Sequence, residues 1–451
     1  MKRNWYDIKV LILGFSKSGI AAAKYLNKKG ANCYITEQKA LKESDKPLLE
    51  ELINNGIKCE FEKHSDEFLN DSHLAITSPG IPPHSELIQK VKEKNIPIIS
   101  EIELAYKETT TPFIAITGTN GKTTTTALTS HILSTKYVAP SCGNIGVPPI
   151  SLLNNDKKYD YLISELSSFQ IEHSKSFKAQ IAMFLNFTPD HIDWHKGLDN
   201  YFAAKAKIFK SPLEPIFAIY NACDEKLYEF SKTTHSENFY FGKEFEKNCA
   251  YIKDNAIYFK RKNEAEYIIS LNEIPLVGDH NYQNVMAAII AAKLVGLKNE
   301  EIKHAIMQFK AVEHRCEFTK KIGNIEFYND SKATNPEASI VAIRSFTNKT
   351  LTLIAGGRDK MTDLTEFCNS INECVSDVIL IGEATQRFEE ALKSNNFNKI
   401  HKTKTLEEAI DKSIELNNEI CLLSPACASY DMFDNYEVRG EVFKNYVISK
   451  S

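Results

Sequence analysis

The chain has 451 residues, of which 43% are hydrophobic and 25% are charged. These proportions are close to those of folded globular proteins and exclude disordered, collagen-like and coiled-coil chains. Lys and Arg number 55 against 59 Asp and Glu, which gives a net charge of −4, so no overall positive charge draws the protein to nucleic acid or to an anionic membrane. An anionic ligand must therefore be held by local groups.

The length of the chain, its cysteines and its apolar runs indicate how many domains it has and where in the cell it works. At about 100–200 residues per domain, the chain is long enough for three domains. The ten cysteines contain no Cys-x-x-Cys pair, so we expect reduced thiols and no zinc site. No run approaches the ~20 apolar residues of a membrane-spanning helix, and the apolar stretch at 10–13 is too short for a signal peptide. We expect a cytoplasmic monomer that neither inserts into a membrane nor binds nucleic acid.

The first segment has the pattern of a nucleotide-binding unit. The apolar run 8–13 ends in a glycine and precedes an Ala-rich helical stretch, which indicates strand, tight turn and helix. A second expected strand, 32–36, ends at Glu37, where a Rossmann unit keeps the acid that reads a ribose. The turn at 14–19 lacks the middle glycine of the dinucleotide fingerprint because Ser16 stands there. The pattern therefore favours a nucleoside diphosphate over classical NAD binding.

The remaining apolar runs repeat a β/α rhythm in three segments, for which we expect domains at 1–110, 111–312 and 313–451. A strand that starts at Leu74 is expected to run into the Ser-Pro-Gly turn at 78–80. Further strands are expected at 96–99, 113–117, 161–163, 181–185, 216–219, 325–327, 351–355, 378–381 and 420–423, with helices at 284–294 and after Pro336. Strands that alternate with helical patterns predict an α/β fold with parallel sheets.

The loop 118–123, Gly-Thr-Asn-Gly-Lys-Thr, carries the strongest local signal. It stands between the expected strand at 113–117 and a helix expected from Thr124 onward. Backbone N–H groups of such a loop form an anion cradle, to which Lys122 adds a positive charge and a threonine hydroxyl adds a magnesium ligand. The general P-loop formula has a glycine where Ile116 stands, so only Gly-x-x-Gly-Lys-Thr matches. Its place between strand and helix favours phosphate binding.

Three residues of the middle segment are candidates for holding a metal. Glu165 directly follows an apolar strand, from which a carboxylate can hold Mg²⁺ directly or through water. His191 lies in the polar run 188–193 at the end of the strand 181–185, although a capping or surface histidine is the alternative. Lys205 lies in an Ala-rich helical stretch, and its chemistry alone is more typical of a solvated helix lysine.

Polar residues also gather at a helix start and at three strand ends. Asn281 and Asn284 lie three residues apart and therefore on one helix face, where amides suit an adenine edge or a phosphate, although Asn281 also suits an N-cap. The runs 329–335, 356–360 and 424–430 each follow an expected strand. Because strand ends of an open parallel sheet line one crevice, we expect these three runs to meet over one ligand.

Taken together, these runs resemble the Mur ligases of bacterial cell-wall synthesis. The motifs that carry the resemblance are 118–123, Gly-Asn-Ile-Gly at 143–146, Glu-Leu-Ser-Ser-Phe-Gln at 165–170, Asp190-His191, the Lys205 helix, His280-Asn281 with Asn284, His314-Arg315, 330–335 and 423–429. They span essentially the whole chain, and the resemblance is strongest to the branch of the family that adds D-glutamate. It implies a Rossmann-like first domain, a P-loop ATPase-like central domain and a Rossmann-like last domain.

The activity that the resemblance implies is ATP-dependent amide formation in peptidoglycan precursor synthesis. The carboxylate of UDP-N-acetylmuramoyl-L-alanine attacks the γ-phosphate of ATP to give an acyl phosphate, which the amine of D-glutamate then attacks. Both partners are anionic, so the site must supply Mg²⁺ and fixed cations to offset their repulsion.

The resemblance also implies residue roles. ATP would contact Gly118, Thr119, Asn120, Gly121, Lys122, Thr123, Thr124, Asn281, Asn284, Arg315 and Asp330. Thr123 and Glu165 would hold one Mg²⁺, and His191 with a carbamylated Lys205 would hold a second. The uridine diphosphate would contact Lys17, Ser18, Glu37, Gln38, Ser78 and Gly80, and the muramoyl-alanine part Asn144, Ser167 and Gln170. D-glutamate would contact Lys332, Thr334, Lys360, Ser429 and Tyr436. The catalytic set would be Lys122, Glu165, His191, Lys205 and Arg315.

The chain departs from the family at two places. At 36–39 it reads Thr-Glu-Gln-Lys, where family members often carry Asp-Thr-Arg, and Tyr436 replaces a common phenylalanine.

The rivals are a folylpolyglutamate synthase, a Mur ligase that adds another residue, and a nucleotide-switched binding protein. The runs 332–335 and 424–429 favour D-glutamate, and the first segment favours a UDP-sugar over a folate. Glu165, His191 and Lys205 speak against a switch, which needs no second metal.

Overall fold

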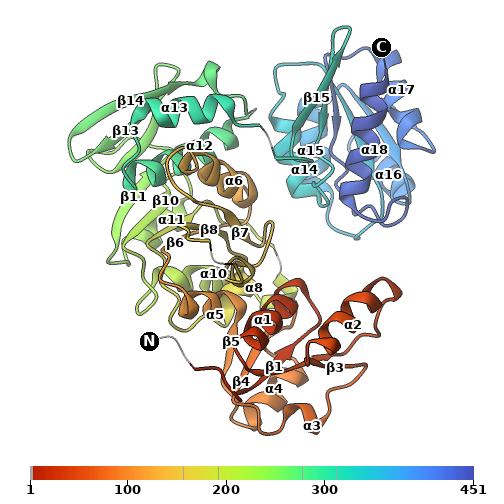
Figure 1. The fold of residues 1–451 in the computed structure, drawn as a ribbon. Helices are drawn as coiled ribbons and strands as arrows, with labels where there is room; N and C mark the ends of the chain where they lie inside the picture. Colours follow the sequence, from red (N-terminus) through yellow and green to blue (C-terminus); the bar gives the residue numbers. More distant parts are fainter. Residues whose placement is uncertain (1–3, 156, 191, 277, 311, 451) are drawn as a thin grey trace. The chain divides into compact units, whose positions relative to one another are not determined.

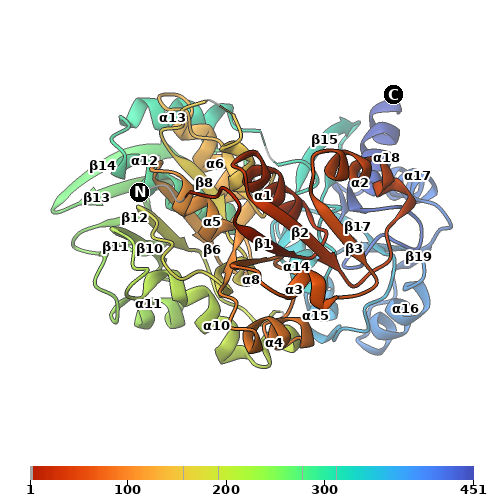
Figure 2. The same cartoon turned by 60° about the horizontal axis from the view of Figure 1, so that its bottom comes forward.

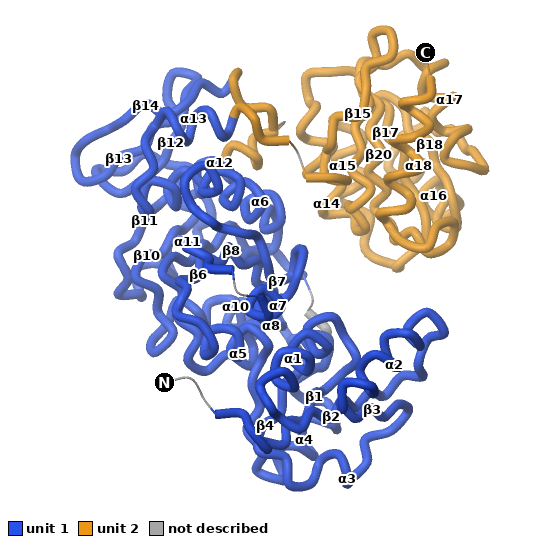
Figure 3. Tube along the Cα trace, in the orientation of Figure 1, with its two compact units in different colours: residues 1–271, 283–306 blue, residues 272–282, 307–451 orange. Residues whose placement is uncertain are grey.

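The computed structural model describes residues 4–155, 157–190, 192–276, 278–310 and 312–450, and it contains three β-sheets covered by helices (Figure 1). The chain divides into two compact units, unit 1 (Met1–Leu271 and Gln283–Ile306) and unit 2 (Asn272–Tyr282 and Met307–Ser451), shown in blue and orange in Figure 3. Among the described residues, no helix combines the length and the apolar character needed to cross a membrane. All ten cysteines are free thiols, as expected.

The first sheet of unit 1 is parallel and has the order β3-β2-β1-β4-β5. Its strands are β1 (Lys9–Leu13), β2 (Asn32–Glu37), β3 (Lys58–Phe61), β4 (Leu74–Thr77) and β5 (Ile98–Ser100). Helices α1 (Lys17–Lys28) and α2 (Lys46–Asn54), the latter preceded by the short η1 (Glu43–Asp45), lie on one face, and α3 (Asp66–Leu69) and α4 (Glu86–Glu93) lie on the other (Figures 1 and 2).

Side-chain alternation along β1 explains these two layers. Val10 and Ile12 belong to the core on the α1 face, whereas Leu11 and Leu13 belong to a second core that includes residues of α3 and α4. The chain reverses its direction across the sheet between β1 and β4, and the carboxyl ends of strands at such a switch point form a ligand crevice. Strand β4 starts at Leu74 and ends at Thr77, where it runs into the Ser-Pro-Gly turn that the sequence predicts.

The second sheet of unit 1 has nine strands in the order β14-β13-β12-β11-β10-β9-β6-β8-β7. The strands are β6 (Phe113–Thr117), β7 (Ser141–Gly143), β8 (Leu162–Glu165), β9 (Ile181–Phe184), β10 (Phe217–Asn221), β11 (Glu237–Phe241), β12 (Cys249–Lys253), β13 (Ala256–Arg261) and β14 (Glu264–Ser270). Strands β7 to β12 are parallel, and β12, β13 and β14 form antiparallel pairs. The sequence patterns did not predict β7 or β11 to β14, because these strands are partly exposed and mix polar with apolar residues.

The helices around this sheet are α5 (Glu101–Glu108), α6 (Lys122–Leu133), α7 (Pro149–Leu152), α8 (Ser168–Glu172), α9 (Ile192–His195), α10 (Leu198–Ala206), η2 (Lys207–Phe209), α11 (Glu225–Ser231), η3 (Leu271–Glu273), α12 (Asp279–Leu294) and α13 (Asn299–Gln308). Helix α6 begins two residues before the expected Thr124, because Gly121 adopts a left-handed conformation (φ +79°) that starts the helix directly at Lys122.

Unit 2 contains a six-stranded sheet of order β15-β16-β20-β17-β18-β19, parallel except for the β15–β16 pair. Its elements are β15 (Glu317–Ile322), β16 (Ile325–Asn329), α14 (Pro336–Arg344), β17 (Leu351–Gly356), α15 (Thr365–Cys374), β18 (Asp377–Ile381), α16 (Thr385–Ser394), β19 (Ile400–Lys402), α17 (Leu406–Leu416), β20 (Ile420–Leu423) and α18 (Tyr436–Ser449). One core lies against α14, α15 and α16, and the other lies against α17 and α18. The parallel β/α rhythm expected for this segment is confirmed.

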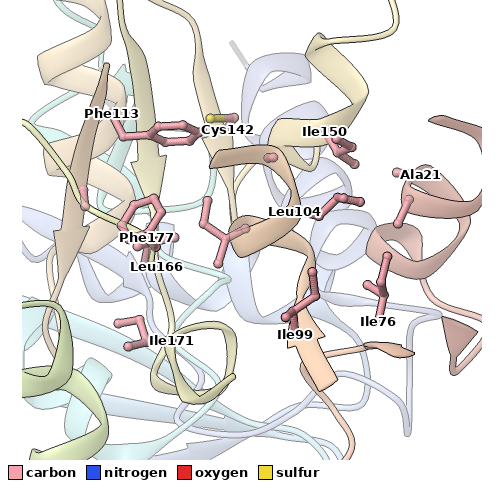
Figure 4. Close-up of a cluster of buried hydrophobic side chains, with 14 of the residues drawn as sticks. Ala21, Ile76, Ile99, Leu104, Phe113, Cys142, Ile150, Leu166, Ile171 and Phe177 are labelled. Atoms are coloured by element: carbon pink, nitrogen blue, oxygen red, sulfur yellow. The ribbon is translucent and has the colours of Figure 1, made fainter. Parts of the chain in front are cut away.

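One continuous apolar cluster joins the two sheets of unit 1. It includes Ile76 of β4, Leu104 of α5 and Phe113 of β6, and Figure 4 shows side chains from these elements in one layer. Three buried carboxylates of α5 support this junction. Glu108 accepts hydrogen bonds from Trp5 Nε1 and Tyr25 Oη, both at 2.9 Å.

The other two α5 carboxylates bind backbone N–H groups of the central part. Glu103 accepts from the N–H groups of Lys175, Ser176 and Phe177 at 2.8–3.0 Å. Burial raises the pKa of Glu103, but these bonds and the Ser176 hydroxyl outweigh burial, and the net pKa is lowered. Glu101 has a single short bond, from the N–H of Ile150 at 2.7 Å, so burial dominates and raises its pKa from 4.5 to about 8.

The raised pKa of Glu101 predicts a pH dependence of stability. The folded state holds the proton more tightly than the unfolded chain, so the free energy of unfolding falls as pH rises from about 4.5 to about 8, by up to about 1.4 kcal/mol per pH unit. Glu101→Gln keeps an acceptor for Ile150 and should remove this slope. Chemical denaturation of both proteins between pH 5 and 8 measures it, with exposed Glu50→Gln as the control. Parallel pH profiles for Glu101→Gln and the parent would contradict the assignment.

Candidate active site

The loop 118–123, which we predicted to bind phosphate, lies between β6 and α6, as expected, and is held by a residue that follows β9. Asn186, just after β9, accepts the N–H groups of Thr119 and Asn120 at 3.1 and 2.8 Å and donates to the Asn120 carbonyl at 3.0 Å. A Cβ at Gly121 would lie 2.4 Å from Oδ1 of Asn284, so this position needs glycine for space as well as for its positive φ. Thr123 and Thr124 are buried in the first turn of α6.

Two lysines meet at one carbonyl of this loop. Lys122 Nζ donates to the Gly118 carbonyl at 3.0 Å and to the Thr119 carbonyl at 2.7 Å. Lys205 Nζ, from α10, donates to the same Gly118 carbonyl at 2.7 Å. The structure therefore brings two amines from distant parts of the sequence to the start of the phosphate loop.

Lys205 is buried, with 2% of its surface exposed, so the interpretation as a solvated helix lysine is wrong. Burial lowers the pKa of Lys205 well below its usual value, and the positive charge of Lys122 lowers it further. Asp190 and Glu165 act in the opposite direction but do not offset burial. A lowered pKa increases the fraction of this amine that is neutral and therefore nucleophilic.

Glu165 ends β8, beside β6, where it pairs with Ile116. Its Oε1 accepts from Asn144 Nδ2 at 2.9 Å. Its Oε2 is buried and has no hydrogen-bond partner among the residues that the structure describes. A buried carboxylate oxygen without a donor is costly unless another group satisfies it, and a cation would do so.

Ser167 and Gln170, which we predicted to contact the substrate, have a clear structural function. Ser167 is the N-cap of α8 and forms a capping box with Gln170, whose Oε1 accepts the Ser167 N–H at 3.0 Å. This pair satisfies the orphan N–H groups of the helix start. Their predicted contact with muramoyl-alanine stays a prediction, as does the role of His191, which lies outside the described residues.

A pocket of about 800 Å³ lies at the switch point of the first sheet. Four of the six residues predicted to contact uridine diphosphate line it: Glu37, Gln38, Ser78 and Gly80. Lys17 and Ser18 are not among its lining residues; Lys17 is exposed, and the Ser18 hydroxyl lies 3.1 Å from that of Ser16. Glu37 Oε2 accepts a hydrogen bond from the N–H of Phe15 at 2.8 Å. This bond occupies one oxygen of the carboxylate that we predicted to contact a ribose.

In unit 2 the predicted ATP residues lie at two turns that bond to each other. Asp330 follows β16; its carboxylate accepts from the Ser424 hydroxyl at 2.7 Å and from the Cys316 N–H at 3.2 Å. Burial raises the pKa of Asp330 to about 7. Arg315 stands directly before Cys316 in the second turn.

The other two predicted ATP residues lie on α12. Asn281 is buried, and one turn later Asn284 accepts a hydrogen bond from the Thr125 hydroxyl at 3.1 Å.

The residues predicted to bind D-glutamate come from the ends of β16, β17 and β20 and from the start of α18. These three strands are neighbours in the sheet. Lys332 Nζ lies 5.4 Å from the centre of the Tyr436 ring, and Thr334 follows in the same turn. Lys360 and Ser429 lie in the runs 356–360 and 424–430, and a β-bridge between Arg358 and Ala428 joins these two runs. The structure brings the three runs together, as expected; that they meet over one ligand stays a prediction.

Comparisons with known proteins cover the same three parts. Residues 8–100 match the Mur ligase MurD-like N-terminal domain, 116–292 the Mur ligase middle domain, and 314–427 the Mur ligase glutamate ligase domain. The UDP-N-acetylmuramoylalanine--D-glutamate ligases of Thermoanaerobacter pseudethanolicus and Clostridioides difficile are 40% and 37% identical to the chain. Each alignment covers 97% of this chain and 98% of the relative.

The chain belongs to the Mur ligase family. Solved structures agree on the fold: UDP-N-acetylmuramate-alanine ligase MurC from Thermotoga maritima (19% identity, TM-score 0.59, covering 98% of this chain and 100% of that one) and MurF from Acinetobacter baumannii (16% identity, TM-score 0.61, covering 100% and 92%). The three-domain α/β fold inferred from the sequence is confirmed.

Sequence reasoning missed two residues that shape the site of this Mur ligase. Asn186 positions the phosphate loop, and its place directly after the strand beside β6 could have indicated it. Arg439 of α18 is 1% exposed and donates to the Ser331 hydroxyl and carbonyl at 3.0 and 2.8 Å and to the Cys427 carbonyl at 3.2 Å. It connects the turns that follow β16 and β20, and nothing in its helical sequence indicates its burial.

The donor set fits magnesium. Mg²⁺ prefers hard oxygen ligands, and the second buried oxygen of Glu165 has no hydrogen-bond donor in the part of the chain that the structure describes. Thr123 lies at the start of α6, where a hydroxyl can reach a metal held by phosphates. The residues present therefore fit one Mg²⁺ at Glu165 and Thr123.

Proposed function

We propose that this Mur ligase joins D-glutamate to UDP-N-acetylmuramoyl-L-alanine with ATP, in cytoplasmic peptidoglycan precursor synthesis. The observation that carries the proposal is the meeting of Lys122, Lys205 and Glu165 at one phosphate loop, in a chain that matches D-glutamate ligases along nearly its whole length. We also propose domains at 1–110, 111–312 and 313–451 for UDP-substrate, ATP and amino-acid binding.

The first half of the reaction makes the substrate carboxyl group electrophilic. A carboxylate is a poor electrophile, so its oxygen first takes the γ-phosphoryl group of ATP and ADP leaves. The phosphate loop with Lys122 orients the triphosphate and offsets its charge. Magnesium held by Thr123 and Glu165 supplies charge neutralisation when bound. In unit 2, Arg315 and Asp330 provide a cation and a ribose acceptor in the proposed scheme.

Lys205 has a second role in the proposal. Its neutral amine attacks CO₂, loses a proton and becomes a carbamate, which converts a cation into an anionic oxygen ligand. The carbamate with His191 would hold a second Mg²⁺. The lowered pKa of Lys205 supports this step because only the neutral amine has a free electron pair.

The second half captures the acyl phosphate. The amine of D-glutamate attacks the carbonyl carbon, and the tetrahedral intermediate expels inorganic phosphate. Lys332 and Lys360 suit the two carboxylates of this amino acid, and Thr334, Ser429 and Tyr436 complete the proposed pocket in unit 2.

The proposal predicts phosphate release only with the complete set of substrates. The protein with ATP, Mg²⁺ and UDP-N-acetylmuramoyl-L-alanine is offered a panel of amino acids of both hands. We expect release with D-glutamate at least about 10²-fold faster than with L-glutamate or with L-lysine, since the carboxylate spacing and handedness must both fit. Equal rates across the panel, or turnover with a folate instead of the UDP-sugar, would contradict the proposal.

A further inference from the structure

The last helix of unit 2, α18, carries a lysine that lies among three carboxylates. Lys444 Nζ is 2.9 Å from Glu317 Oε1 and 3.1 Å from Glu313 Oε1, and Glu441 Oε1 lies 3.6 Å away. The side chains of Lys444 and Glu317 are only 16% and 17% exposed. Burial lowers the pKa of Lys444, but hydrogen bonds to Glu317 and Glu313 outweigh burial, and the net pKa is raised. Lys444 therefore stays charged, and the site described so far does not use it.

Glu317 connects Lys444 to the turn that contains Arg315. Its Oε2 accepts a hydrogen bond from the backbone N–H of His314 at 3.0 Å and another from Asn329 Nδ2 at 3.4 Å. One carboxylate therefore bonds to the lysine on α18, to the start of this turn and to the end of β16.

The turn needs such support because its backbone is strained. His314 and Cys316, on either side of Arg315, have φ angles of +62° and +43°, which are uncommon for residues that have a Cβ atom. Such conformations persist only where the surrounding structure holds them. Helix α18 also lies directly against the His314 ring, since a Cβ at Gly440 would be 2.1 Å from His314 Nδ1. The position of Arg315 therefore depends on α18.

A metal site is the alternative use of this cluster. Ligand atoms of Glu313, His314 and Glu441 lie within 4.8 Å of one another. The ammonium group of Lys444, however, lies 3.1 and 3.6 Å from the two carboxylates and supplies the positive charge that a metal would bring. The cluster therefore favours the ammonium group over a metal ion.

The charges near Arg315 explain what Lys444 adds. Glu313 and Glu317 stand two residues before and two residues after Arg315. Burial dominates the pKa of Asp330, and the charge of Arg315 lowers it, so the guanidinium group lies near the proposed ribose acceptor. Without the positive charge of Lys444, the carboxylates of Glu313 and Glu317 would attract this guanidinium group to themselves.

We propose that Lys444 is a positioning residue for ATP binding. Its ammonium group neutralises Glu313 and Glu317 and, through Glu317, holds the turn, so that Arg315 stays directed at the nucleotide. The inference rests on the proposed function, which assigns ATP to Arg315. In this scheme Lys444 acts through Glu317 and the turn rather than by touching a substrate.

Replacing Lys444 with methionine tests the proposal, because methionine keeps an unbranched apolar stem and removes the charge. We expect the KM for ATP to rise at least about fivefold while the KM for the UDP-sugar, which the proposed function places in unit 1, stays within about twofold. The Kd of a non-hydrolysable ATP analogue, measured by calorimetry without the other substrates, should also rise at least about fivefold. Lys444→Arg, which keeps the charge, should bind the analogue within about twofold of the parent.

The matched control is Lys412→Met. It removes an exposed lysine of unit 2 that forms an ion pair with Glu415 on α17. Such exposed pairs contribute little, so neither the KM for ATP nor the Kd of the analogue should change.

A second substitution distinguishes the effect of charge from a loss of packing. In the Lys444→Met background, Glu313→Gln removes one of the negative charges beside Arg315 and should improve the Kd of the analogue by at least about twofold. A mere loss of packing would not be repaired by removing a further partner of the cluster. A thermal melt shows whether Lys444→Met is folded. If it is not, Lys444→Gln, which keeps a hydrogen-bond donor for Glu317, replaces it in the same comparisons.

Three results overturn the positioning role: ATP affinity as in the parent in the folded uncharged variant, an equal loss in Lys444→Arg, or no recovery with Glu313→Gln. Failure of the parent itself to bind the ATP analogue overturns the proposed function instead, because this measurement needs no turnover.

Discussion

Replacing Lys205 with methionine is expected to lower kcat by at least about 10³-fold, equivalent to about 4 kcal/mol of transition-state stabilisation. Methionine fills the buried space and keeps the contact with Tyr201, whose ring lies 4.6 Å from Lys205 Nζ, but it provides no amine for carbamate formation. Added bicarbonate should not restore turnover to this variant. In the parent, removal of CO₂ should lower activity and its return should restore it.

Controls distinguish loss of the carbamate from loss of the folded structure in Lys205→Met. Lys210→Met changes an exposed lysine of the same stretch and should leave kcat within about twofold. A thermal melt shows whether Lys205→Met is folded, and a ¹³C NMR signal from ¹³CO₂ that disappears in this variant reports the carbamate itself. Full activity in Lys205→Met would remove carbamylation from the mechanism.

Replacing Glu165 with glutamine is expected to lower kcat by about 10²-fold or more and to raise the Mg²⁺ concentration needed for half-maximal activity by at least about tenfold. Glutamine keeps the size of the side chain and an oxygen for Asn144. It removes the negative charge and replaces the buried oxygen that has no partner among the described residues with an amide NH₂ group, which cannot bind a cation. Initial rates against Mg²⁺ at saturating ATP measure both effects.

The matched control for this variant is Glu229→Gln, which removes an exposed carboxylate of a surface ion pair with Lys232. It should leave the Mg²⁺ dependence unchanged. If Glu165→Gln lowers the melting temperature strongly but leaves the Mg²⁺ dependence as in the parent, Glu165 is a structural carboxylate and our assignment of the metal is wrong.

The sequence predicted the parts of the site that depend on local order. An apolar strand precedes each of these parts: the loop 118–123, the turns after β16, β17 and β20, and the start of α1. A short motif directly after a strand predicts the same kind of loop wherever that strand lies in the sheet. The same reasoning predicted most strands of the three sheets. It failed for β3, β7, β11 to β15 and β19, which are short or mix apolar residues with polar, partly exposed ones.

Lys205 shows where local reasoning ends. Its own helix, rich in alanine, suits a solvated lysine, and only the family resemblance assigned it to a metal. The structure buries it against the Gly118 carbonyl, 87 residues away in sequence. Arg439 and Asn186 are similar cases, because each acts through partners that no spacing in the chain indicates.

By itself, therefore, the sequence determined the class of fold, the phosphate loop and the family, since these depend on short ordered motifs and on the period of apolar residues. Only the tertiary structure decided that Lys205 is buried and has a lowered pKa, and that one oxygen of Glu165 has no donor among the described residues. Burial and the pKa depend on which distant segments pack around a group, because desolvation and nearby charge come from the neighbours in space.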